Sequence, residues 1–278
     1  MEKTIIKNSL FGEYTFGILE NGLKVYVMEK REFSSAYAIF GTEYGSIDTK
    51  FSKNGGEEIS VPEGIAHFLE HKLFESEDGD AFTKFAATGA YANAYTSFDK
   101  TCYLFSCTNN FYENLDILLS FVQSPYFTEK TVKKEQGIIG QEIKMYQDSP
   151  NWRVLFNMLG CMYKNHPVKI DIAGTVESIA QIDEKLLYQC YNTFYNPANM
   201  FVCIAGNVDA NKVFEKIQNS VTSKEKVEIK RGDFLETKEI KEHFVAQKLQ
   251  VSNPLFCLGY KEILNNKKAT IKEKIVAD

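Results

Sequence analysis

The segment His67-Phe-Leu-Glu70-His71 carries the residues of this chain that are best suited to chemistry. Helix positions four apart lie on the same face, so His67 and His71 can bind one metal ion together. Glu70 lies beside this pair, within reach of a water held by the metal. Neutral imidazoles suit Zn²⁺, which in catalytic sites takes three protein ligands and keeps a fourth position for water. The segment therefore predicts a catalytic zinc site on a helix over residues 63–76.

The order H-x-x-E-H is a known signature of zinc peptidases. The alternative is two solvent-facing histidines on an amphipathic helix. Only four histidines occur in 278 residues, so a chance match is on the order of one in a hundred. Leu69 and Phe74 supply apolar anchoring, and Pro62 suits the beginning of a helix. The other two histidines, His166 and His243, are better explained as structural or surface residues, because an acidic third ligand is available elsewhere.

Two glutamates on a second predicted helix, over residues 128–147, are candidates for that third ligand. Val132 and Ile139 recur there at helical spacing. Glu135 and Glu142 are seven residues apart, so two helical turns place them on one face. One can bind the metal while the other orients a histidine or the ligand carboxylate. Taken alone, the simpler interpretation is two surface glutamates paired with lysines, since exposed glutamate is common on helices.

These residues together resemble the pitrilysin/insulinase family of zinc peptidases, which includes the mitochondrial processing peptidases. In that family a glutamate ligand follows the H-x-x-E-H helix by some seventy-odd residues, and a second glutamate precedes the ligand by seven. Here Glu142 follows His71 by 71 residues, and Glu135 precedes Glu142 by seven. The resemblance implies that His67, His71 and Glu142 are the zinc ligands. It also implies that Glu70 is the catalytic base and Glu135 a supporting acid of the catalytic site.

The likeness extends over roughly residues 15 to 220. The run Asn93-Ala94-Tyr95-Thr96 resembles the family's substrate-binding edge strand, which implies backbone pairing with an extended peptide. Without the resemblance, the same run is an ordinary half-buried edge strand. Other similar segments are residues 21–25, 44–46, 166–167, 174–175, 199–200 and 205–207.

Predicted strands and helices alternate along the chain. A hairpin is expected over residues 14–29, with its turn at Asn21-Gly22, and a loop over 45–61. Further strands are expected at 36–44, 92–96, 101–107 and 200–205, and further helices at 82–88, 110–122, 152–162, 183–194 and 209–217. The pattern predicts an α+β fold, a two-layer sandwich of a mainly antiparallel sheet with helices packed on one side.

The composition becomes highly charged after residue 222. We expect a metallopeptidase α/β domain over residues 1–222, a charged linker over 223–243 and the truncated start of a second, similar domain over 244–278. In this last part a strand-like alternation over 245–260 precedes a helical pattern over 267–277. In the family, a second half or a partner subunit helps to hold the substrate and supplies an arginine and a tyrosine that match no position here. A second homologous domain or subunit, in a homo- or heterodimer, is therefore the expected partner.

The bulk composition is typical of a cytoplasmic enzyme. The net charge of −5 argues against nucleic acid as a partner. No apolar run is long enough for a signal peptide or a membrane span, so no membrane insertion is expected. Six cysteines without C-x-x-C spacing indicate reduced thiols.

The sequence thus predicts a zinc-dependent endopeptidase that hydrolyses extended peptides or small proteins through a metal-activated water. One alternative is a non-catalytic scaffold or partner subunit of a processing-peptidase-like complex, against which the intact motif argues. The other is a structural zinc module. Such sites are closed and rich in cysteine, whereas no cysteine lies near residues 67–71.

Overall fold

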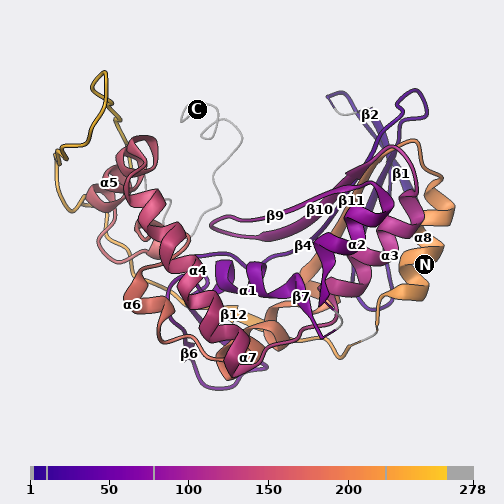
Figure 1. The fold of residues 1–278 in the computed structure, drawn as a ribbon, viewed down its shortest axis with the longest axis horizontal. Helices are drawn as coiled ribbons and strands as arrows, with labels where there is room; N and C mark the ends of the chain where they lie inside the picture. Colours follow the sequence, from indigo (N-terminus) through magenta and orange to yellow (C-terminus); the bar gives the residue numbers. More distant parts are fainter. Residues whose placement is uncertain (1–2, 11, 78, 223, 262–278) are drawn as a thin grey trace. The chain divides into compact units, whose positions relative to one another are not determined.

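The computed structural model describes residues 3–10, 12–77, 79–222 and 224–261 (Figure 1). The chain forms two compact units. The first contains the residues up to Ile143 together with Asp171–Gly232, and the second contains Lys144–Ile170 and the segment from Asp233 onward. None of the described helices is both long and apolar enough to cross a membrane.

The first unit is built on a seven-stranded sheet with the strand order β1-β2-β3-β11-β4-β10-β9. Neighbouring strands are antiparallel, except that β3 and β11 are parallel. The strands are β1 (Lys3–Asn8), β2 (Gly12–Ile18), β3 (Lys24–Glu29), β4 (Ala36–Thr42), β9 (Tyr91–Thr96), β10 (Thr101–Cys107) and β11 (Met200–Gly206). The sheet is therefore mainly antiparallel, as the sequence predicts, and β9 forms one of its edges.

Helices cover one face of this sheet (Figure 1). On that face Val25, Phe40 and Phe105 are fully buried, whereas Tyr26 and Tyr37 on the opposite face keep solvent exposure. The helices packed against the sheet include α1 (Ile65–Leu73), α2 (Ala81–Thr88), α3 (Phe111–Val122) and α8 (Ala210–Ser220). The remaining helical segments of this unit are α4 (Glu129–Gln147), whose last residues belong to the second unit, α6 (Val176–Ile179), α7 (Glu184–Phe194) and the short η2 (Pro197–Asn199). The predicted α+β fold with helices on one side is confirmed.

Several short strands escape prediction from the sequence. Residues 45–61, expected as a loop, contain β5 (Lys50–Lys53) and β6 (Ile59–Ser60). A third strand, β12 (Ile229–Arg231), pairs with β5 and lies inside the charged segment 223–243. A strand of two to four residues is too short to show an alternating pattern. In β5, for example, Phe51 is the one fully buried side chain. Sequence reasoning also missed β1, β7 (Glu75–Ser76) and β8 (Gly79–Asp80).

The strand-like alternation over residues 245–260 corresponds to neither helix nor strand in the described structure. An alternating pattern forms a strand only when a neighbouring strand accepts and donates its backbone hydrogen bonds. The helical pattern over 267–277 lies outside the described residues.

The start of α1 depends on a close backbone approach. Gly64 caps the helix with a φ of 86°, a conformation that favours glycine. A Cβ at this position would lie 2.4 Å from the carbonyl oxygen of Ala173. The Ser178 hydroxyl donates to the carbonyl oxygen of Glu63 at 2.9 Å. These contacts hold the beginning of α1 against the loop before α6.

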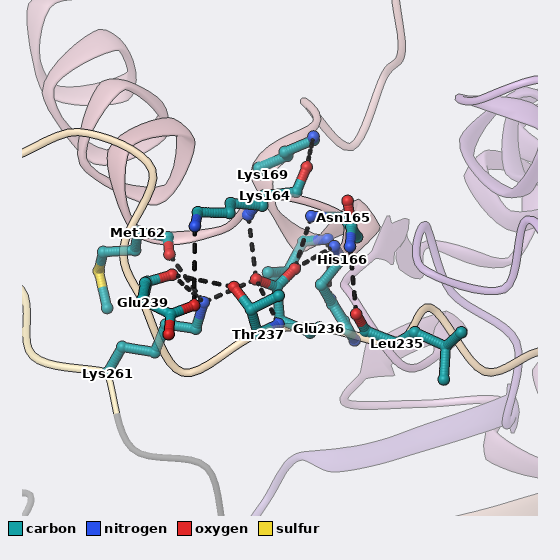
Figure 2. A network of polar contacts seen from close by, with 11 residues as sticks. Met162, Lys164, Asn165, His166, Lys169, Leu235, Glu236, Thr237, Glu239 and Lys261 are labelled. Carbon is teal, nitrogen blue, oxygen red and sulfur yellow. Dashed lines mark hydrogen bonds and ion pairs between the residues drawn. The ribbon is translucent and has the colours of Figure 1, made fainter.

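The second unit contains α5 (Pro150–Met162), η1 (Pro167–Lys169) and an extended segment anchored by Glu236 (Figure 2). Oε2 of Glu236 accepts hydrogen bonds from the backbone N–H groups of Asn165 and His166, each at 2.6 Å. Oε1 accepts from the N–H of Lys164 at 3.0 Å and from Nζ of Lys261 at 2.6 Å. The Lys261 side chain is only 1% exposed. Successive N–H groups that converge on a carboxylate form an anion-binding nest.

This arrangement makes the Glu236 anchor dependent on pH. Burial alone would raise the pKa of Glu236, but the hydrogen bonds from Lys261 and the three N–H groups outweigh it and lower that pKa from 4.5 to about 2. A depressed folded-state pKa stabilises the folded form above the ordinary value of the group. The contribution is therefore complete at neutral pH and is lost as the pH falls from 4.5 through about 2.

Replacing Glu236 with glutamine tests this anchor. The amide nitrogen of Glu236→Gln cannot accept, so the two hydrogen bonds on that side are lost. We expect local stability to fall by roughly 2–3 kcal/mol, the scale for hydrogen bonds to a charged group. Hydrogen exchange at the amides of residues 164–166, measured on the full chain at pH 7, should quicken. Glu242→Gln changes an exposed glutamate of the same segment and should leave that exchange unchanged; an equal effect of both substitutions would contradict the anchor.

Candidate metal centre

Three predicted ligands from two helices converge in the first unit. His67 and His71 lie on α1 and Glu142 lies on α4, and one ligand atom of each lies within 4.8 Å of the others. Nε2 of His67 is 3.7 Å from Oε1 of Glu142, and Nε2 of His71 is 3.4 Å from Oε2. Around a tetrahedral ion with bonds of about 2.0–2.1 Å, neighbouring ligand atoms lie about 3.3 Å apart. The donor set and its spacing therefore fit a zinc ion.

Glu135 reaches the same site from one side. Its Oε1 is 2.9 Å from Nδ1 of His71, the ring nitrogen that does not face Glu142. Metal-binding histidines commonly donate their second ring N–H to a carboxylate, which fixes the orientation of the ring. Burial alone would lower the pKa of His71, but the hydrogen bonds to Glu135 and Glu142 raise it to about 10. The two carboxylates that hold a proton on His71 also favour a metal cation.

His67 has a different environment. Burial, and next the charge of His71, lower the pKa of His67 to about 4, so its ring is neutral at pH 7, the form that binds metals. Its Nδ1 is buried and has no hydrogen-bond partner among the residues that the structure describes. Nδ1 of His71 therefore has a carboxylate partner, whereas Nδ1 of His67 has none among the described residues.

Glu70 lies on α1 between the two histidines and is only 8% exposed. Its Oε2 accepts a hydrogen bond of 2.7 Å from the hydroxyl of Thr96 on β9. Burial raises the pKa of Glu70, and the Thr96 hydrogen bond opposes that shift. A carboxyl group whose pKa is raised toward neutrality is suited to take up and return a proton.

The predicted substrate strand is β9, which contacts α1. Among the strands of the described sheet, β9 pairs only with β10, so the backbone on its outer side has no strand partner. Asn93 and Tyr95 are exposed, whereas Ala94 and Thr96 are partly buried toward the helices. The four predicted residues therefore lie at one edge of the sheet, but their side chains point to two different faces.

Some polar residues near the site were not singled out from the sequence. Lys72 on α1 is fully buried and pairs with Glu75. Thr101 is fully buried on β10, and its hydroxyl lies 3.3 Å from that of Thr96. The period of two along β9 could have placed Thr96 on the inner face, but its contact with Glu70 depends on how α1 packs.

The two remaining histidines do not join this cluster. His166 accepts a hydrogen bond from the N–H of Val168 at the start of η1, and His243 is exposed. All six cysteines are free thiols.

The chain matches known protein families and relatives. Residues 57–176 match the family model of insulinase (peptidase family M16), and residues 181–264 match that of the M16 inactive domain. The chain is 51% identical over 247 residues to the uncharacterized zinc protease YmfH of Bacillus subtilis (strain 168), a match that covers 87% of this chain and 58% of that protein. It is 30% identical over 215 residues to the uncharacterized zinc protease YmxG of the same strain, covering 74% and 51% respectively.

Solved structures lead to the same family. A crystal structure of an M16-like peptidase from Alicyclobacillus acidocaldarius matches with a TM-score of 0.81 and 43% identity, over 85% of this chain and 56% of that one. Pitrilysin shares the fold, with a TM-score of 0.66 at 17% identity, over 79% of this chain and 24% of that one. The chain therefore belongs to the insulinase family of peptidases, family M16. It spans about half the length of the curated relatives that it matches.

The contacts of the two α4 glutamates differ, which predicts different effects of substitution. Glu142→Gln removes a charged ligand, so we expect zinc binding to be lost or severely weakened. Glu135→Gln leaves all three ligands in place and should weaken zinc affinity by roughly 10- to 100-fold, as losses of supporting hydrogen bonds do. Competition with a metal chelator measures both affinities. A reversed order of the two effects would exchange the roles of the two glutamates.

The histidine pair is tested separately. His71→Ala leaves an incomplete ligand set, so we expect the purified protein to contain less than one zinc per chain by atomic absorption. His243→Ala removes an exposed histidine and serves as the matched control. Stoichiometric zinc in the His71→Ala protein would refute the assignment.

Proposed function

We propose that this chain supplies the zinc-binding half of an M16 endopeptidase that hydrolyses peptide bonds in extended peptides or small proteins. The observation that carries this proposal is the convergence of His67, His71 and Glu142 on one point, with Glu70 buried next to His71 on the same helix. The names of the relatives as zinc proteases support the choice of metal.

When bound, Zn²⁺ acts as a Lewis acid and lowers the pKa of water. The residues of this chain perform the proton transfers. Glu70 accepts a proton from the attacking water and later passes it to the leaving amine. Glu135 keeps the ring of His71 oriented through Nδ1. The outer edge of β9 pairs its backbone with the peptide, so that the substrate lies extended beside α1.

Activity in this proposal needs a second homologous half or a partner subunit, in a homo- or heterodimer. Phe244, Phe256, Leu258 and Tyr260 are all more than half exposed, and a second half or partner would cover such apolar side chains. The match of residues 181–264 to the M16 inactive domain supports a family partner for this segment. A non-catalytic scaffold subunit is less well supported, because such a subunit needs neither Glu70 nor the ligand set.

The Glu236 anchor belongs to the same segment. A single carboxylate there accepts hydrogen bonds from four backbone N–H groups and from Lys261. Charge-assisted hydrogen bonds of this kind can fix an extended segment that has little regular structure of its own. The exposed aromatic residues Phe244, Phe256 and Tyr260 lie on the same extended segment. In this proposal the second half or partner covers these exposed side chains.

Glu70→Gln tests the proposed chemistry. The substitution keeps the size of the side chain but removes the base. In the complete protein, with the second half or partner subunit present, we expect zinc to be retained. Hydrolysis of a peptide library should fall on the order of 10²- to 10⁴-fold, the usual scale of general acid–base catalysis.

Glu77→Gln is the matched control, because Glu77 is exposed and follows α1 closely in the sequence. Its activity should equal that of the unsubstituted protein. Near-normal hydrolysis by the Glu70→Gln protein would show that another group is the base.

A further inference from the structure

A line of hydroxyl groups runs from the sheet to Glu70. The Thr96 hydroxyl donates to Oε2 of Glu70 at 2.7 Å and lies 3.3 Å from the Thr101 hydroxyl. Thr101 in turn donates to the carbonyl oxygen of Tyr44 at 2.9 Å. Thr96 and Thr101 are directly opposite each other in the β9–β10 pair. Two side chains of the sheet, Thr101 and Thr96, therefore connect its backbone to the proposed base.

Counting protons determines the direction of these hydrogen bonds. A hydroxyl has one proton, and a carbonyl oxygen only accepts. The Thr101 hydroxyl therefore donates its one proton to the carbonyl oxygen of Tyr44. An ionised Glu70 also only accepts, so the Thr96 hydroxyl donates its proton to Oε2 of Glu70. The two short distances are the hydrogen bonds of this state, and the 3.3 Å separation of the hydroxyls is a close contact between them.

We propose that Thr96 is a positioning residue for Glu70, held in place by Thr101. The terminal torsion of a glutamate is soft, and the hydrogen bond to Oε2 restricts it, so that Oε1 keeps one direction as the oxygen that exchanges the proton. This inference rests on the proposed function, because it assumes that Glu70 is the base.

The competing role for Thr96 is direct contact with the substrate. Its position argues against this role, since the Thr96 side chain points inward to a carboxylate on α1, whereas Asn93 and Tyr95 of the same strand are exposed. A peptide that adds to the edge of β9 would contact the backbone of Thr96 and not its hydroxyl. A positioning residue should therefore affect turnover and not affinity for the peptide.

Two substitutions at one position test the proposal in the complete protein. Thr96→Val keeps the shape and removes the hydroxyl, whereas Thr96→Ser keeps the hydroxyl. We expect kcat of the Thr96→Val protein to fall roughly 10- to 100-fold, the scale for loss of a hydrogen bond to a charged group. KM and zinc content should stay within about twofold, and Thr96→Ser should restore most of kcat.

Thr15→Val, on β2 of the same sheet, is the matched control and should leave kcat unchanged. Unchanged kcat in the Thr96→Val protein would overturn the proposal, and so would a loss that Thr96→Ser fails to restore.

A readout without turnover completes the test. In the Glu70→Gln background, peptide affinity measured by fluorescence anisotropy should be the same with and without the Thr96→Val substitution. A fall in affinity on adding Thr96→Val would assign Thr96 to substrate binding and refute the positioning role. A different result would refute the proposed function, namely near-normal hydrolysis by the Glu70→Gln protein itself.

Discussion

The structure of the site depends on one constraint, which is that α1 is almost wholly buried and yet carries charged and titratable side chains. Buried polar groups are costly unless they are paired. Glu70 has Thr96, His71 has Glu135 and Glu142, and Lys72 has Glu75. These partners come from three neighbouring elements. Pairing the buried polar side chains of α1 therefore positions β9, α4 and the segment after α1 around the candidate metal site.

The position of α1 is itself set by backbone packing at its start. Gly64 has a left-handed conformation and touches the Ala173–Gly174 backbone more closely than any side chain would allow. The second element that determines the geometry of the site is the edge strand β9. Because β9 contacts α1 and has an open outer side among the described strands, the strand proposed to bind a peptide is also the strand that contacts the proposed base. In the proposed function, substrate alignment and proton transfer would therefore be connected through one short element.

The sequence by itself determined the family, the α+β class and most regular elements, because these follow from spacing. The i, i+4 histidines and the seven-residue separation of Glu135 and Glu142 are local patterns that need no knowledge of the fold. The strands β5, β6 and β12 were missed because strands of two to four residues are too short to show a period. The alternation over residues 245–260 corresponds to no strand among the described residues, because a strand needs a hydrogen-bonding partner that local alternation does not supply.

Only the tertiary structure decided which atoms of these residues meet. The sequence pairs Glu70 with the histidines, but it contains no sign that Thr96, 26 residues later, donates to its carboxylate. It left open from the residues alone which α4 glutamate faces both histidines, whereas the packing of α4 on α1 places Glu142 against both Nε2 atoms and Glu135 against one Nδ1. Contacts between distant segments depend on how buried surfaces pack in three dimensions, and a linear pattern records the residue types but not that packing.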